Sequence, residues 1–330
     1  MTRSRRRALA SPADRGPFLA TEPVADRALC GWRVRSVIDL PELPVWTQGD
    51  RRPDVTIALG RVTPVGDAAP GMNWNAAGDG GFRFTVAAVG SYRISQGRVI
   101  TIDPQVGAMA SAVRQYLLGT AFGVLCHQRG LLPLHASCVA INGRAVAIAG
   151  ASGAGKSSLA AALVRLGYPL LGDDVCVIDA SEINAPRVLP AIPRLKLWRD
   201  VLDAFGLAVD PAARILEGIE KYQAQALPDR PAVPPPLTPL PLGVVYYLDQ
   251  AGSRDNQGFH PIRGAERAAA LAGAVYRRKM GLALGLLPQI FTATMTVGAL
   301  VPGHRLLRHG DLSGLDALAR SVVARQEGRG

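Results

Sequence analysis

The residues of this chain best suited to chemistry lie between positions 135 and 174. A glycine-rich run there fits the pattern G-x-x-x-x-G-K-S, and an apolar stretch at residues 145–149 precedes it as a strand should. Residues 157–166 are rich in Ala and Leu, so a helix should begin at the loop and direct its N–H groups and positive dipole end at an anion. The residues expected to hold a phosphate chain are Gly150, Ala151, Ser152, Gly153, Ala154, Gly155, Lys156, Ser157 and Ser158. The alternative is a glycine-rich turn that binds nothing.

Two side chains of this loop predict how a nucleotide would be held. Lys156 should reach the β- and γ-phosphates, and the Ser157 hydroxyl should ligate Mg²⁺. The sequence therefore predicts ATP and Mg²⁺ as cofactors.

Two adjacent carboxylates, Asp173 and Asp174, follow the next expected strand at residues 168–171, which should run parallel to the loop strand. Neighbouring carboxylates at the end of a buried strand repel each other and lose hydration, and a bound Mg²⁺ relieves both costs. One aspartate would ligate the metal and the other would accept a proton from a substrate hydroxyl. The sequence leaves open which does which, and a turn with solvated carboxylates is the alternative.

A histidine is expected beside the same loop. Asn142-Gly143 is a strong hairpin signal, and pairing outward from a two-residue turn places His135 opposite Gly150, or opposite Ala151 if the turn has three residues. The imidazole would orient an aspartate or neutralise phosphate. The alternative is a polar residue that only caps a strand end.

This constellation resembles the catalytic domain of HPr kinase/phosphorylase. The matching residues are His135, Gly150, Ser152, Gly153, Gly155, Lys156, Ser157, Asp173 and Asp174. The resemblance implies an α/β P-loop kinase domain of the HPr kinase/phosphoenolpyruvate carboxykinase type with a mixed sheet, here preceded by a small β-rich domain. It also implies a homo-oligomer, since HPr kinases are hexamers.

The chain departs from that family after Asp174. Residues 190–198, PAIPRLKLW, stand where HPr kinases carry a Glu-x-Arg-Gly-Leu-Gly-Ile-like segment, and here the chain is similar to kinases of lasso-peptide precursors. That likeness implies phosphorylation of a serine hydroxyl on a ribosomally made precursor peptide. The alternatives are an HPr-type serine kinase/phosphorylase, a small-molecule P-loop kinase and a conformational NTPase.

Two groups of basic residues are further candidates for phosphate or substrate contacts. Arg194 and Lys196 alternate with leucines, so both should lie on one face of an extended segment, where they could clamp phosphate or solvate an edge strand. Arg277, Arg278 and Lys279 follow an expected helix at residues 266–276; near a triphosphate they could stabilise transferred charge, and otherwise they would complement the helix dipole.

The composition of the chain limits the classes of partner and the compartment that we expect. The net charge of +11 invites a nucleic-acid interpretation, but the basic residues are spread along the chain without interleaved aromatic residues, which disfavours it. The four cysteines lack C-x-x-C spacing and indicate a reducing cytoplasm. No apolar run is long enough to predict a membrane span.

The expected organisation has three parts: a basic arm at residues 1–25, a β-rich domain at 26–103 and the P-loop kinase domain at 104–330. A linking helix at residues 104–130 should open at Asp103-Pro104, because Asp is a good cap and Pro suits a first turn. Residues 212–222 are also predicted to be helical.

Overall fold

The computed structural model describes residues 25–66, 71–182, 184–209, 214–215, 219–224, 233, 235–251, 256–308, 312 and 314–328. Apart from residue 25, the expected basic arm lies outside the described residues. No helix in the described part of the chain has the length and apolar character needed to cross a bilayer.

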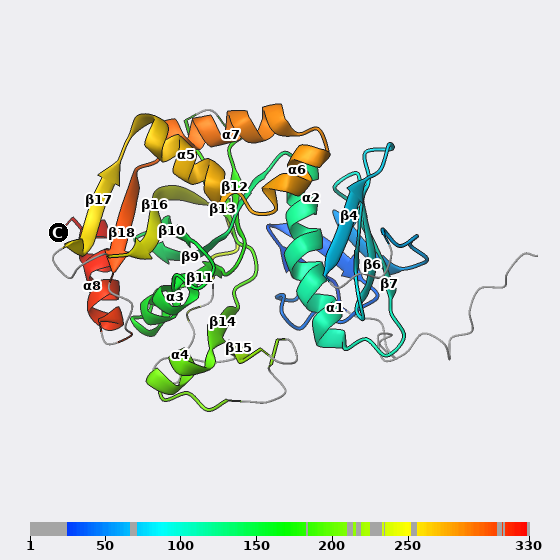
Figure 1. Cartoon of the computed structure of the whole chain (residues 1–330), viewed down its shortest axis with the longest axis horizontal. Coiled ribbons are helices and arrows are strands. Elements are labelled where there is room, and N and C mark those ends of the chain that lie inside the picture. Colours follow the sequence, from blue (N-terminus) through cyan, green and yellow to red (C-terminus); the bar gives the residue numbers. More distant parts are fainter. Residues whose placement is uncertain are drawn as a thin grey trace, which may run out of the picture.

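A mixed sheet forms the N-terminal part, in the order β1-β2-β3-β7-β6-β5-β4 (Figure 1). Its strands are β1 (Arg27–Leu29), β2 (Trp32–Ser36), β3 (Val55–Leu59), β4 (Met72–Ala76), β5 (Phe82–Val86), β6 (Gly90–Ser95) and β7 (Val99–Pro104). In β5, buried and half-buried residues alternate, as expected for a sheet with one face on a core.

A helical segment separates this sheet from the second one (Figure 1). It consists of α1 (Ala110–Tyr116), the π-helical turn η2 (Leu117–Ala121) and α2 (Phe122–Gln128). The helix therefore begins six residues after Pro104, because strand β7 takes up Asp103 and Pro104: Pro104 pairs with Gly90, and the Asp103 carboxylate accepts the N–H of Val62 at 3.1 Å. Tertiary pairing has overridden a local helix-start signal.

The second sheet is also mixed and runs in the order β11-β9-β10-β16-β13-β12-β8, with β18 beside β16 and β17 beside β18. The predicted α/β class with a mixed sheet is thus confirmed. Its strands are β8 (Leu132–Leu134), β9 (Ala136–Ile141), β10 (Arg144–Gly150), β11 (Leu170–Gly172), β12 (Cys176–Asp179), β13 (Arg187–Leu189), β16 (Leu240–Gln250), β17 (Gly258–Ile262) and β18 (Gly303–Arg308).

Helices cover both faces of this sheet. Along β10, Val146 and Ile148 pack in one core with α3 (Lys156–Arg165) and α8 (Leu315–Gln326). The intervening alanines of β10 face a second core with α5 (Gly264–Ala274) and α7 (Leu287–Leu300). This burial on both sides explains the uninterrupted apolar run before the glycine-rich loop. The short helices α4 (Arg199–Ala204) and α6 (Arg278–Ala283) complete the described helices.

The β9–β10 hairpin has the register that Asn142-Gly143 predicted. Ile141 pairs with Arg144, and the pairing continues to Ala136 opposite Ala149. Strand β11 is antiparallel to β9 and therefore parallel to β10 in direction, although β9 lies between them. The hairpin thus brings His135 to the end of β10 where the loop begins.

The prediction of a helix over residues 212–222 is wrong for its C-terminal end, which forms a strand. Residues Lys221–Ala224 form strand β15, which pairs antiparallel with β14 (Leu195–Trp198), and Arg214 bridges to Tyr222. The rest of that stretch falls partly outside the described residues.

Gly123 in α2 offers a test of how tightly the helical segment packs on the second sheet. A Cβ at this position would lie 2.7 Å from Cδ1 of Tyr276, whose N–H is bonded to Pro133 at 2.8 Å. We expect Gly123→Ala to lower the free energy of unfolding by about 1–3 kcal/mol through overpacking. Gly273→Ala is the matched control, because that helical glycine has open space around its Cβ position. Alanine there should raise the free energy of unfolding by about 0.5–1 kcal/mol. Urea denaturation measures the free energy of unfolding of both variants. Equal changes in the two variants would contradict the tight packing of Gly123 against Tyr276.

Candidate functional site

The glycine-rich loop connects β10 to α3, as its sequence predicted. Gly150 and Gly155 both have left-handed backbone conformations, with φ of 151° and 96°. A Cβ on Gly150 would lie 2.5 Å from the carbonyl oxygen of Leu248, so only glycine fits where β10 passes β16. Helix α3 then begins at Lys156 and presents its N-terminal N–H groups to the loop.

Two cations contact the loop, one at its own end and one from a distant strand. Lys156 is 6% exposed, and its ammonium group donates to the carbonyl oxygens of Gly150 at 3.0 Å and Ala151 at 2.9 Å. Arg308, the last residue of β18, donates to the carbonyl oxygen of Ala154 at 3.2 and 3.1 Å. Burial lowers the pKa of Lys156, yet the nearby aspartates favour its charged form.

A cavity of about 180 Å³ lies over this loop. Its lining includes four basic side chains, of Lys156, Lys196, Lys221 and Arg308, together with loop residues. A cavity with this excess of positive charge beside a helix N-terminus suits a polyanion such as a phosphate chain. Of the predicted loop positions, Ser152, Gly153, Gly155, Ser157 and Ser158 line it.

The Asp173 carboxylate is the point where three elements meet. It accepts hydrogen bonds from the Ser157 hydroxyl on α3 at 2.9 Å, the Ser137 hydroxyl on β9 at 2.6 Å and the backbone N–H of Lys196 on β14 at 3.0 Å. Burial and the charge of Asp174 raise the pKa of this carboxyl, although the hydrogen bonds oppose the shift. Only 3% of the residue is exposed, so its negative charge is costly as it stands.

Asp174 has a different environment. Its carboxylate forms an ion pair with the Lys196 ammonium group at 2.7 Å. Burial acts to raise the pKa of Asp174, but the charge and hydrogen bond of Lys196 outweigh it, and the pKa falls below its ordinary value. The backbone is left-handed, with φ of 68°, a conformation that aspartate tolerates better than most residues. Asp174 is therefore held ionised in a constrained position.

His135 fixes the backbone of Asp174. Its Nδ1 lies 3.1 Å from the Asp174 carbonyl oxygen, and because a carbonyl can only accept, Nδ1 must carry the proton. Burial, followed by the charge of Lys156, lowers the pKa of His135, so the imidazole is neutral at pH 7. Of the two roles predicted for His135, this geometry suits orienting an aspartate.

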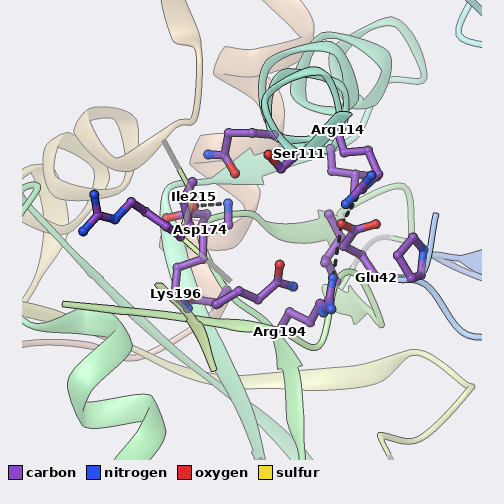
Figure 2. A pocket seen from close by; sticks show the side chains of 14 residues that line it. Glu42, Ser111, Arg114, Asp174, Arg194, Lys196 and Ile215 are labelled. Carbon is purple, nitrogen blue, oxygen red and sulfur yellow. Dashed lines mark hydrogen bonds and ion pairs between the residues drawn. The ribbon is translucent and has the colours of Figure 1, made fainter. Parts of the chain in front are cut away.

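A second pocket, of about 270 Å³, opens on the same aspartates. Figure 2 shows Asp174 and Lys196 on one side of it, and Glu42 with Arg114 and Arg194 on the other. Glu42 forms ion pairs with Arg114 at 2.8 Å and with Arg194 at 3.2 Å. Arg194 and Lys196 thus line one pocket, as their alternation predicted, but they bind different carboxylates.

The remaining basic candidates are not brought to either cavity. Among the described residues lining the two cavities, Arg277, Arg278 and Lys279 are absent. Arg277 instead lies over the ring of Tyr276, at 5.3 Å from its centroid. Arg308 occupies the place expected for such a cluster. No spacing in the sequence marks Arg308; it reaches the loop because β18 lies parallel to β16, and the carboxyl ends of parallel strands share an edge with the loop.

The donor set fits Mg²⁺. Ser157 and Asp173 are in contact and provide a hydroxyl and a carboxylate oxygen, and Asp174 follows directly in the chain. The described residues contain no group of three His, Cys, Asp or Glu side chains that could hold a metal. Mg²⁺ bound with a nucleotide needs only one or two carboxylates, since phosphate oxygens and water supply its other ligands.

Binding of inorganic tripolyphosphate tests whether the loop cavity holds phosphates. Lys156→Met should weaken binding about 10-fold or more, because the variant loses charge-assisted hydrogen bonds. Lys279→Met is the control, since that exposed lysine lies outside both cavities, and its affinity should match the wild type. Isothermal titration calorimetry gives both values. An unchanged affinity in Lys156→Met would rule out phosphate binding through this loop.

The chain was also compared with known proteins. No protein-family model matches it, and no curated protein does. Among solved structures it is similar to the HPr(Ser) kinase/phosphatase from Coxiella burnetii, at 14% sequence identity and a TM-score of 0.29, over 59% of this chain and 95% of that one. A TM-score this low does not define a shared fold, so we infer function from the geometry of the site itself.

Proposed function

We propose that this chain is an ATP- and Mg²⁺-dependent kinase that phosphorylates a serine hydroxyl of a peptide or protein. The observation that supports this most strongly is the position of Asp174, which lines both the loop cavity and the second pocket. A carboxylate between a phosphate cradle and a separate pocket is where phosphoryl transfer needs a group to receive the hydroxyl proton.

The two aspartates then take different roles. Both line the second pocket, but Asp173 contacts Ser157, the expected metal ligand, whereas Asp174 also lines the loop cavity and is kept ionised by Lys196. When bound, Mg²⁺ would be held by Ser157 and Asp173 and would neutralise charge on the β- and γ-phosphates. We therefore assign metal binding to Asp173 and acceptance of the proton to Asp174.

The transfer step follows from these positions. The acceptor oxygen attacks the γ-phosphorus, its proton passes to the Asp174 carboxylate, and the bond from the γ-phosphorus to the bridging oxygen breaks to release ADP. Lys156 and Arg308, both beside the loop, supply positive charge where negative charge accumulates. His135 acts through the backbone of Asp174 and is a positioning residue in this scheme.

Segments that are distant in sequence enclose the second pocket, where the acceptor would bind. Glu42, from the segment after β2, lies across the pocket from Asp174 (Figure 2). The sequence likeness described above favours a ribosomally made precursor peptide, and a lasso-type precursor is the first acceptor to assay.

Aspartate variants test the assignment. With MgATP and serine peptides, Asp174→Asn should lower kcat about 10²-fold or more while leaving the affinity for MgATP close to wild type. Asp173→Asn should instead raise the Mg²⁺ concentration needed for half-maximal rate. Asp249→Asn, an exposed aspartate at the end of β16, is the control and should behave as wild type.

Mass spectrometry of the peptides measures the added phosphate, and a coupled assay measures ADP. Full activity in Asp174→Asn would show that the proton acceptor is misassigned. ATP consumption without any phosphorylated peptide would instead indicate an NTPase.

A further inference from the structure

The second pocket lies where the N-terminal part of the chain meets the second sheet. Pro41 and Glu42 follow strand β2, Ser111 and Arg114 belong to helix α1, and Asp173 and Asp174 also line the pocket. Figure 2 shows Asp174 across the pocket from Glu42 and Arg114. One hydrophobic cluster runs through both parts and includes Ile38, Leu43, Val113, Val177 and Ile192. The N–H of Cys30 also bonds the carbonyl oxygen of Pro190 at 2.8 Å. The walls of the pocket are therefore joined by a common core.

Glu42 is incompletely satisfied in this pocket. Its side chain is 10% exposed, and both of its ion pairs are made through Oε1, which lies 2.8 Å from Nε of Arg114 and 3.2 Å from Nη1 of Arg194. Among the described residues Oε2 has no hydrogen-bond partner, and Nη1 of Arg194 makes its ion-pair contact without hydrogen-bond geometry. A buried polar atom without a partner costs about 1–3 kcal/mol, and more when charged. Folding alone does not explain why an acceptor and a donor are left together here.

The free groups define the ligand that would satisfy them. Oε2 of Glu42 can accept an N–H or O–H donor, and Nη1 of Arg194, although ion-paired with Oε1, can donate to a better-placed acceptor. A peptide unit provides both, through its N–H and its carbonyl oxygen. A free ammonium group would suit Glu42 less well, because the two guanidinium groups leave the cluster with a net positive charge that repels it.

We propose that this pocket binds the acceptor as a segment of peptide, with a main-chain amide on Glu42 and Arg194 and the serine side chain directed at Asp174. The inference rests on the kinase function proposed above and adds that the N-terminal part of the chain forms half of the acceptor site. Glu42 is a binding residue that selects peptide acceptors over free serine, and it does not line the loop cavity.

Methylation of single peptide nitrogens tests the contact with Glu42. A library of nine-residue peptides with one central serine first identifies a sequence that the wild-type protein phosphorylates. Each peptide nitrogen of that sequence is then methylated in turn. Methylation of the one nitrogen that Glu42 binds should lower kcat/KM about 10-fold or more, since a hydrogen bond to a charged group is lost. Glu42→Gln should lower kcat/KM for the unmethylated peptide by a similar factor, and methylation should then have little further effect. If methylation at every peptide nitrogen lowered kcat/KM by the same factor in Glu42→Gln as in the wild type, no peptide nitrogen would bind Glu42, and the proposal would be overturned.

A second variant blocks the pocket without altering its charges. Ser111→Trp should fill the space beside Arg114 and abolish peptide phosphorylation, with the calorimetric affinity for MgATP unchanged. Met109→Trp is the matched control, because Met109 is 59% exposed just before α1 and does not line the pocket. Wild-type rates in Ser111→Trp would overturn the assignment of the acceptor site while leaving the kinase function intact.

Two other outcomes distinguish a failure of the proposed peptide site from a failure of the proposed kinase function. If free serine were phosphorylated with a higher kcat/KM than any library peptide, the acceptor would be a small molecule and the peptide assignment wrong. If the wild-type protein bound MgATP but transferred phosphate to neither probe, the proposed function would fail, and the acceptor site with it.

Discussion

The geometry of the site depends on one buried carboxylate. Asp173 receives hydrogen bonds from a hydroxyl on β9, a hydroxyl at the start of α3 and a backbone N–H of β14, and so fixes three elements at the mouth of the loop. Each bond to a charged acceptor is worth about 1.5–3 kcal/mol. The raised pKa nevertheless shows that burial and the neighbouring carboxylate outweigh them. A divalent cation at Ser157 would stabilise the ionised form of this carboxyl, which supports our proposal that Ser157 and Asp173 hold Mg²⁺.

The second aspartate is controlled by its neighbours rather than by its own burial. Lys196 holds the carboxylate of Asp174 and His135 holds its carbonyl group, so a residue with a left-handed backbone is restrained from two sides. Constrained backbone of this kind occurs at functional sites, where the surrounding structure must offset its cost. The restraint leaves the carboxylate between two cavities, one beside the glycine-rich loop and the other closed by the Glu42 cluster.

The sequence predicted the local parts of this site well. The loop, the helix that follows it, the hairpin register and the position of His135 are all consequences of short motifs, and the structure contains each of them. The helix start at Asp103-Pro104 failed because a cap signal also fits a strand end when the sheet offers a partner, as Gly90 does for Pro104. The predicted helix over residues 212–222 failed at its end for a similar reason, since β14 pairs with Lys221–Ala224.

Contacts between distant segments could not be predicted in this way. Glu42, Arg114 and Arg194 come from three separate elements, and no spacing in the sequence relates them. Arg308 could be placed beside the loop only after β18 was known to lie parallel to β16. The cluster of Arg277, Arg278 and Lys279 was a candidate for phosphate contacts, but these residues line neither cavity, and Arg277 lies over the ring of Tyr276.

The most direct test is a crystal structure of the protein with Mg²⁺ and a non-hydrolysable ATP analogue. Our account predicts the triphosphate along residues 150–157, the metal on Ser157 and Asp173, and the γ-phosphate facing Asp174 across the opening to the second pocket. A triphosphate bound elsewhere, or a γ-phosphate directed away from both aspartates, would contradict it.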